Sequence, residues 1–206
     1  MKRISVLLIA LFFISSCKKE SDVHPDIVGT PGGTLNANSV PEVTGKIDGV
    51  PFSLVVNNFN IIEMDTAEYY PLISTSSYLA LYLDAIADTV AKQGFLFDRT
   101  FGINSIPPSD SLFVSQFNSG AWSFLAAGNE IFNISYVDQN GDQWDTSSGT
   151  ADQTGSNFNV SEKLVIHKNG RTGVLLKATF NCKLYDNSGH VKNLTNGSAI
   201  FQYQNF

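Results

Sequence analysis

Residues 174–185 have the sequence VLLKATFNCKLY, in which apolar and polar side chains alternate along most of the stretch. Side chains that alternate with a period of two point to opposite faces of a β-strand. One face carries Val174, Leu176, Ala178, Phe180, Cys182 and Leu184, and the other carries Lys177, Thr179, Asn181 and Lys183. This segment predicts a long strand that covers a core, and it places Cys182 inside that core.

The turn before this strand sets its pairing with the segment upstream. A two-residue loop would place Leu176 opposite Lys163, which mismatches the apolar face. A three-residue loop over residues 168–170 places Phe180 opposite Phe158, so that two apolar faces meet. We therefore expect the three-residue loop.

Two more turns extend the pattern into a C-terminal meander. At residues 139–141, Gln-Asn-Gly, a three-residue loop places Trp144 opposite Tyr136 on the apolar face, so Trp144 is expected in the core or at its rim. Residues 186–189 form the next turn, and residues 198–203 read as the last strand.

The N-terminal half of the domain repeats this alternation of strands and turns. Residues 43–49 and 52–56 read as an opening hairpin, and residues 78–86 alternate as a strand, although a helix over residues 79–93 also fits the spacing. Aromatic residues make up 12% of the chain, which suits pleated, half-buried surfaces. We predict an all-β fold for residues 42–206, a single antiparallel β-sandwich or partly open barrel.

The N-terminus has the composition of an export signal. Lys2 and Arg3 precede the apolar residues 4–14, a run too short to span a membrane. The sequence Ile-Ser-Ser-Cys at residues 14–17 resembles the lipobox of bacterial lipoproteins. A plain secretory signal with a coincidental cysteine is the alternative.

The lipobox resemblance implies that residues 1–16 are removed and that Cys17 is acylated, with palmitate-type chains anchoring the protein to a membrane. Cys182 would then have no partner for an intramolecular disulfide, because the chain has two cysteines. Residues 17–41, rich in Pro, Gly and Asn, read as a flexible linker. The expected location is the cell envelope, at the outer membrane. The sequence does not distinguish the periplasmic face of that membrane from the cell surface.

The overall layout is similar to that of Bacteroidota lipoproteins with a C-terminal β-sandwich domain. The resemblance rests on the leader, on GKIDGVPF at residues 45–52 and on NGSAIF at residues 196–201. These are structural turn motifs, so the resemblance implies a fold and a location and transfers no catalytic residue.

The charge of the chain argues against nucleic acid as a partner. The full chain has a formal charge of −6, and removal of Lys2 and Arg3 leaves 11 basic and 19 acidic residues, a charge of −8. Nucleic-acid binding requires a basic surface that displaces counterions.

Three sets of residues are candidates for functional sites. Asp138, Asn140 and Asp142 resemble the start of a calcium loop, but glycine and glutamate are missing at the later positions, and a polar Asn-Gly hairpin is the alternative.

Tyr69, Tyr70, Trp122 and Trp144 are candidates for stacking on sugar rings, with core packing as the alternative. Thr66, Thr89 and Ser111 follow aspartates in a pattern that resembles the O-glycosylation signal of Bacteroidota, and we expect them in loops or at strand ends.

The sequence contains no nucleophile elbow, zinc-protease motif or phosphate-binding loop, and it predicts no cofactor. The expected function is therefore a non-catalytic binding module at the cell envelope, with glycan as the first expected ligand. A structural, assembly or adhesion component is the alternative. A hydrolase with a carboxylate pair formed only by folding is a third hypothesis.

Overall fold

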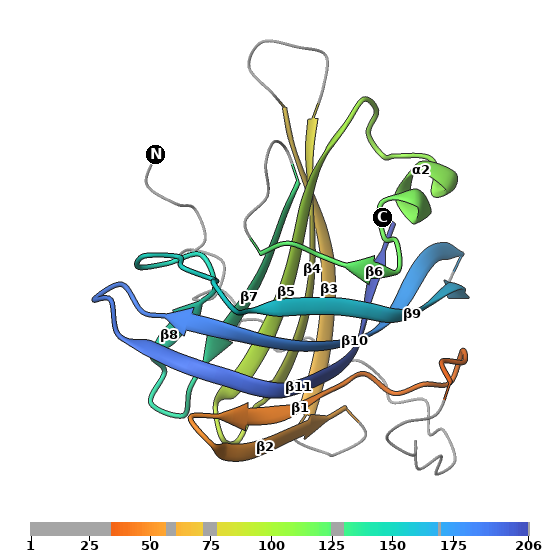
Figure 1. Ribbon diagram of the computed structural model, residues 1–206. Coiled ribbons are helices and arrows are strands. Elements are labelled where there is room, and N and C mark those ends of the chain that lie inside the picture. The colour runs from red at the N-terminus through yellow and green to blue at the C-terminus, as the bar shows by residue number, and fades with distance from the viewer. Residues whose placement is uncertain (1–33, 57–60, 72–77, 125–129, 169, 206) are drawn as a thin grey trace.

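The computed structural model describes residues 34–56, 61–71, 78–124, 130–168 and 170–205. The strands form one antiparallel 11-stranded sheet that is not closed into a barrel. The all-β prediction is confirmed, and the sheet folds over on itself to give a sandwich of two layers (Figure 1).

The first layer contains the strands of the opening hairpin and the C-terminal meander, together with the short strand β6. These are β1 (Glu42–Ile47), β2 (Val50–Val55), β6 (Gly120–Ala121), β9 (Asn157–Lys168), β10 (Arg171–Tyr185) and β11 (Val191–Gln204). Their order across the layer is β6, β9, β10, β11, β1 and β2.

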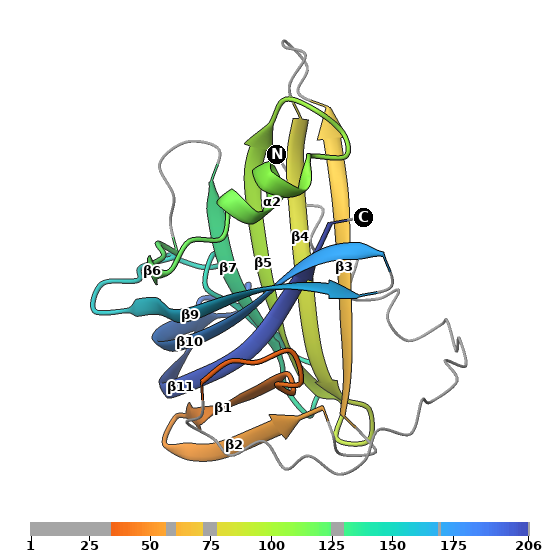
Figure 2. The same ribbon diagram turned by 90° about the vertical axis from the view of Figure 1, so that its right-hand side faces the viewer.

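The second layer contains the strands of the middle of the chain. These are β3 (Ile61–Pro71), β4 (Tyr78–Asp88), β5 (Gln93–Ile103), β7 (Ile131–Val137) and β8 (Gln143–Asp145), in that order. The two layers are continuous at one corner, where Tyr185 of β10 pairs with Asp145 of β8. Away from that corner the strands of one layer run across those of the other, as the two views show (Figures 1 and 2).

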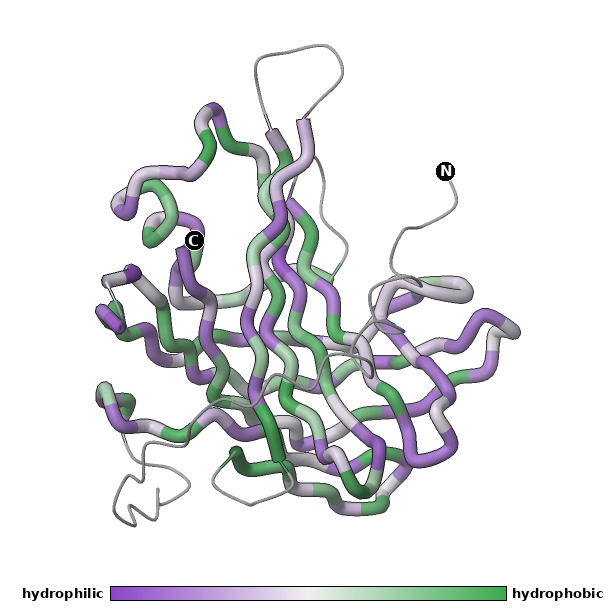
Figure 3. Tube along the Cα trace, turned by 180° about the vertical axis from the view of Figure 1, so that it is seen from behind, coloured by the Kyte–Doolittle hydropathy of each residue, from purple (hydrophilic) through white to green (hydrophobic). Residues whose placement is uncertain are grey.

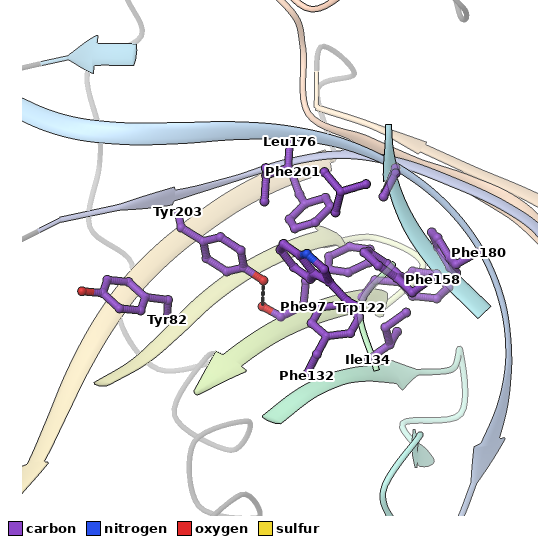
Figure 4. Packing of buried hydrophobic residues seen from close by; sticks show 14 of the residues in the cluster. Tyr82, Phe97, Trp122, Phe132, Ile134, Phe158, Leu176, Phe180, Phe201 and Tyr203 are labelled. Atoms are coloured by element: carbon purple, nitrogen blue, oxygen red, sulfur yellow. Dashed lines mark hydrogen bonds between the residues drawn. The ribbon is translucent and has the colours of Figure 1, made fainter. Parts of the chain in front are cut away.

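Aromatic side chains from both layers fill the space between them. Phe97 of β5 stacks on Phe201 of β11 with ring centroids 4.7 Å apart, and Phe158 of β9 contacts Phe132 of β7 at 4.3 Å. The hydroxyl of Tyr203 donates to the carbonyl of Phe97, a hydrogen bond across the sandwich (Figure 4). These contacts make the inter-layer core aromatic and continuous.

The strand predicted at residues 174–185 is confirmed as part of β10. All six residues of its predicted core face are buried, namely Val174, Leu176, Ala178, Phe180, Cys182 and Leu184. Burial raises the pKa of the Cys182 thiol above its ordinary value, so the thiol stays protonated and acts as a small apolar side chain.

The predicted three-residue loop before β10 is wrong. Arg171 pairs with Lys168, and Leu176 lies opposite Lys163, which is the register of the two-residue loop. The polar head of Lys163 turns away from the core and donates to the carbonyl of Val114.

A bulge then restores the match between the apolar faces. The register shifts between Lys177 and Ala178, and Ser161 is the extra residue on β9. Beyond it, Phe180 pairs with Phe158 as predicted. A bulge adds one residue to one strand, so the tight turn and the matched faces coexist.

The other predicted turns and strands are confirmed. Trp144 pairs with Tyr136, and the amide of Asp138 donates to the carbonyl of Asp142, which closes a three-residue loop. Residues 78–86 belong to strand β4, so the alternative helix over residues 79–93 does not form. The opening hairpin is β1–β2. The C-terminal meander is confirmed for β9, β10 and β11, but the β7–β8 hairpin, which we expected in it, lies in the second layer, and β8 pairs with β10 instead of β9.

A short helix, α2 (Asp110–Ser115), lies between β5 and β6. The hydroxyl oxygen of Ser109 caps it by accepting from the amide of Leu112, and Phe113 packs into the core. No helix among the described residues is long and apolar enough to cross a membrane.

Much of the N-terminal region lies outside the described residues, including Cys17, the predicted signal peptide at residues 1–16 and residues 17–33 of the predicted linker. Within residues 34–41, Leu35 is buried, and its amide donates to the Glu162 carboxylate at 2.7 Å. This part of the predicted linker therefore contacts β9.

Gly197 of β11 is expected to tolerate no larger residue. A Cβ atom there would lie 2.6 Å from the Phe180 ring and 2.8 Å from the Phe180 carbonyl oxygen. We expect Gly197→Ala to lower the free energy of unfolding by about 1–3 kcal/mol through overpacking, measured by urea denaturation. Ser198→Ala, one residue along, is the control and should change it by less than about 0.5 kcal/mol. Equal stability of the two variants would contradict the close packing of β11 on β10.

Candidate functional site

The outer face of the second layer is unusually apolar. Antiparallel sheets that cover a core on one face usually carry polar residues on the other. Here the side chains of β4 that point outward are Leu79, Leu81, Leu83, Ala85 and Ala87. Figure 3 views the molecule from this side, and hydrophobic stretches gather near the turn between β4 and β5.

Two cross-strand rows at this end enclose a pocket of about 160 Å³, which we call the outer-face hollow. Each row crosses β3, β4, β5 and β7 in that order. The first row is Ile62, Ala87, Gly94 and Val137, and the second row is Met64, Ala85, Leu96 and Ser135. Ala87 and Gly94 in the middle of the first row, together with Ala85 in the second, leave space between larger side chains, and most of the residues that line this space are apolar.

The Gly94 position maintains the floor of the hollow. A Cβ atom at this position would lie 2.8 Å from the Cβ of Ala87 on the neighbouring strand. Glycine therefore allows β4 and β5 to approach closely here, and it leaves the hollow free of a side chain.

A third row, parallel to the first two, adds a carboxyl group beside the hollow. It consists of Thr66, Leu83, Asp98 and Asn133. The Asn133 side-chain amide donates to Asp98 Oδ2 at 2.8 Å and to the hydroxyl of Ser135 at 3.1 Å. Thr146 Oγ1 donates to Asn133 Oδ1 at 2.6 Å, which fixes the orientation of the amide.

The environment of Asp98 raises its pKa to about 7. Burial is the largest cause, because it disfavours the charged form, and the nearby carboxylate of Asp145 adds to it. The hydrogen bond from Asn133 acts in the opposite direction. The charge of Asp98 is therefore sensitive to pH near neutrality, which is typical of functional sites.

Trp122, a predicted stacking residue, is part of the core. Only 8% of it is exposed. Phe158 stacks on its indole with centroids 5.6 Å apart, and the Arg99 guanidinium lies 4.6 Å from the ring centroid. These contacts leave no open ring face for a sugar.

The other three predicted stacking residues do not share a surface with Trp122. Tyr69 is half-buried and meets Tyr82 edge to face, whereas Tyr70 is exposed and donates to the carboxylate of Glu68. Trp144 is half-buried under the ammonium of Lys192, at the hairpin of β7 and β8. The four aromatics therefore form no common binding face.

Asp138, Asn140 and Asp142 form a turn. Asp138 Oδ1 accepts the amides of Asn140 and Asp142, and Oδ2 accepts from the Trp144 indole at 3.1 Å and lies 3.5 Å from Lys192 Nζ. In the described ranges, no group of three or more His, Cys, Asp or Glu side chains is placed to hold a metal ion.

The three predicted O-glycosylation residues lie in three different settings. Thr89 is exposed in the turn between β4 and β5, as expected. Thr66 lies in the middle of strand β3, and Ser111 lies in the first turn of α2, so the expectation of loops or strand ends is wrong for these two. Their modification stays a prediction.

Folding also brings three carboxyl groups together on the inner face of β3 and β4. Asp65 pairs directly with Asp84, and Glu63 lies two pairs further along, opposite Ile86. Asp84 has no exposed surface, and its Oδ2 accepts the amide of Gln202 at 2.9 Å. Because a substrate in solvent does not reach Asp84, this cluster is a structural contact between the layers and no support for the hydrolase hypothesis.

Sequence reasoning did not find the outer-face hollow or Asp98. The available signal was that β4 carries apolar residues at both odd and even positions, which indicates a strand with two apolar faces. Comparison with protein family models, curated proteins and solved structures finds no match to this chain.

Proposed function

We propose that this chain is a lipid-anchored envelope protein whose β domain is a non-catalytic binding module that docks a protein partner in the outer-face hollow. The observation that carries the proposal is the pair of apolar rows, in which Ile62 and Met64 remain 39% and 38% exposed. Apolar patches that are exposed to solvent mark interaction sites.

The size of the hollow suits one bulky apolar side chain of a partner. Cavities of about 150 Å³ lined by apolar residues accept a group as large as benzene. Protein interfaces concentrate their binding energy in such anchor pockets, where a side chain becomes fully desolvated. The polar residues Thr89 and Lys92 at one end of the hollow resemble the rim of such an interface.

Glycan binding receives less support from the geometry. Sugar recognition uses accessible aromatic faces, whereas Trp122 is buried, and Trp144 and Tyr69 are half-buried against Lys192 and Tyr82. The assembly or adhesion alternative thus becomes the leading function. The anchor at Cys17 rests on the lipobox-like leader and would hold the domain at the envelope.

Site-directed photocrosslinking in cells that make the native chain tests the proposal. A photoreactive amino acid at Met64 is expected to give one protein adduct of defined mass, identified by mass spectrometry. The same amino acid at Val165, which is 41% exposed on β9, is the positional control and should not give this adduct.

A matched pair of charge substitutions completes the test. Ala87→Glu places a carboxylate in the hollow and should abolish the adduct from Met64, because an unpaired charge in an apolar contact is costly. Thr179→Glu, exposed on β10, should leave the adduct intact. No adduct from Met64, or an adduct insensitive to Ala87→Glu, would overturn the docking function.

A further inference from the structure

The hollow and Asp98 lie on the same face and in neighbouring rows. Leu96 and Ser135 form the pair that closes the hollow, and Asp98 and Asn133 form the next outward-facing pair along β5 and β7. Two residues along a strand correspond to about 7 Å. When one group of a ligand occupies the hollow, a second group of the same ligand can therefore reach the Asp98 carboxyl.

Asp98 has no cationic partner within the described part of the chain. Its one hydrogen-bond donor there is Asn133, at 2.8 Å on Oδ2, and none of the ion pairs of the described residues includes it. The charged or titratable groups that interact with it are the carboxylate of Asp145 on β8 and the hydroxyl of Tyr203 on β11, and neither is a cation. A carboxyl in such a setting gains from an external positive charge.

We propose that Asp98 is the second half of the binding site, so that the ligand presents a bulky apolar group to the hollow and a cationic group to Asp98. In a protein partner, the matching element is an extended segment with an apolar residue and a Lys or Arg two positions away, because such residues share one face of a strand. This inference rests on the proposed function and names the chemistry of the partner.

The charge of this chain supports a basic partner. The carboxyl groups of Asp88 and Asp98 lie at or beside the hollow, whose lining includes one lysine, Lys92. The chain as a whole carries a formal charge of −6. A second copy of the same chain would bring these carboxylates together, which disfavours self-association through this face. Asn133 acts as a positioning residue, since its amide holds Asp98 and Ser135 together.

A pair of small probes separates the two halves of the site. 3-Phenylpropylamine carries a benzene ring and an ammonium group, and 3-phenylpropan-1-ol is its neutral analogue of equal length. Titration of the purified full-length chain, followed by NMR of the methyl groups of Ala85, Ala87 and Leu96, gives both dissociation constants. At pH 8.5 we expect the amine to bind about tenfold more tightly, as one charge-assisted hydrogen bond provides.

Variants and pH assign this preference to Asp98. Asp98→Asn should remove the advantage of the amine and leave the affinity of the alcohol unchanged, because the amide keeps the shape but not the charge. At pH 5.5 the carboxyl is protonated, so the native chain should also lose the preference. Ala87→Glu should weaken the alcohol, and Thr179→Glu should affect neither probe.

The outcomes distinguish this inference from the proposed function. If the alcohol binds and the amine gains nothing at pH 8.5, the hollow stands and the role of Asp98 is overturned. If neither probe shifts the methyl signals of the hollow, both proposals fall. A preference for the amine that survives Asp98→Asn would also overturn the assignment.

Discussion

Phe201→Ala is expected to lower the free energy of unfolding by about 3–5 kcal/mol, the usual cost of removing a buried phenylalanine. Phe201 of β11 is fully buried and stacks on Phe97 of β5, with ring centroids 4.7 Å apart and planes 15° apart. It also meets Trp122 and Phe158, so its loss removes contacts to both layers and leaves a cavity. Urea denaturation followed by circular dichroism measures the change.

Val165→Ala is the control for this prediction. Val165 belongs to the same layer but is exposed, and its truncation should change the free energy of unfolding by less than about 0.5 kcal/mol. A loss of less than about 1 kcal/mol in Phe201→Ala would show that the rings do not carry the contact between the layers. If Phe201→Ala fails to fold, Phe201→Leu should fold and still lose more stability than the control.

Asp84→Asn is expected to raise the free energy of unfolding by about 1–3 kcal/mol at pH 8, because folding forces the native carboxyl either to bury a charge or to take up a proton, whereas the amide of the same shape does neither. Burial, followed by repulsion from Glu63, raises the pKa of Asp84 well above its ordinary value, and Asp65 adds to this shift. The hydrogen bond from the backbone N–H of Gln202 opposes this shift. In Asp84→Asn the side-chain oxygen of the asparagine can still accept it.

The sign of the pH dependence follows from this raised pKa. The protonated form stabilises the fold fully below the unfolded value near 4, and this contribution is lost as pH rises through the higher folded value. The advantage of Asp84→Asn over the native chain should therefore grow between pH 4 and pH 8. Thr179→Asn, an exposed control that involves no ionisable group, should show no such trend. A native chain that is more stable than Asp84→Asn at pH 8 would contradict this account.

The strands with one apolar face were predictable from the sequence, because burial and periodicity agree in them. In β10 every second residue from Val174 to Leu184 is buried, and the alternation alone assigns the core face. The turn at Asn140 was equally clear, since one loop length places Trp144 opposite Tyr136. In both cases a local rule and the tertiary contact favour the same arrangement.

The register of the β9–β10 hairpin was only partly predictable. The pairing of Phe180 with Phe158 is correct, but the loop is not, because the bulge at Ser161 absorbs one residue in the middle of the ladder. Face matching assumes a continuous ladder and therefore assigns the extra residue to the turn. The one sequence signal near Ser161 is Glu162, which face matching places opposite Leu176 on the apolar face.

The candidate site could not be predicted because it depends on pairings between strands that are distant in the sequence. Met64, Ala85, Leu96 and Ser135 become neighbours only through the order β3, β4, β5, β7. The leucines at alternating positions in β4 predict a strand, yet they lie on the outer face, and Tyr82 lies on the inner one. Periodicity identifies two faces but does not tell which of two apolar faces is covered.

We propose that a protein partner covers the outer-face hollow in the native envelope, and oxidative footprinting of Met64 measures this coverage. The chain has only two methionines, and Met64 is 38% exposed, so its oxidation reports on access to the hollow. Hydroxyl-radical labelling should modify Met64 several-fold more slowly in intact envelopes than in the purified chain, while Val165 reacts at the same rate in both. Equal rates for Met64 in the two preparations would contradict the claim.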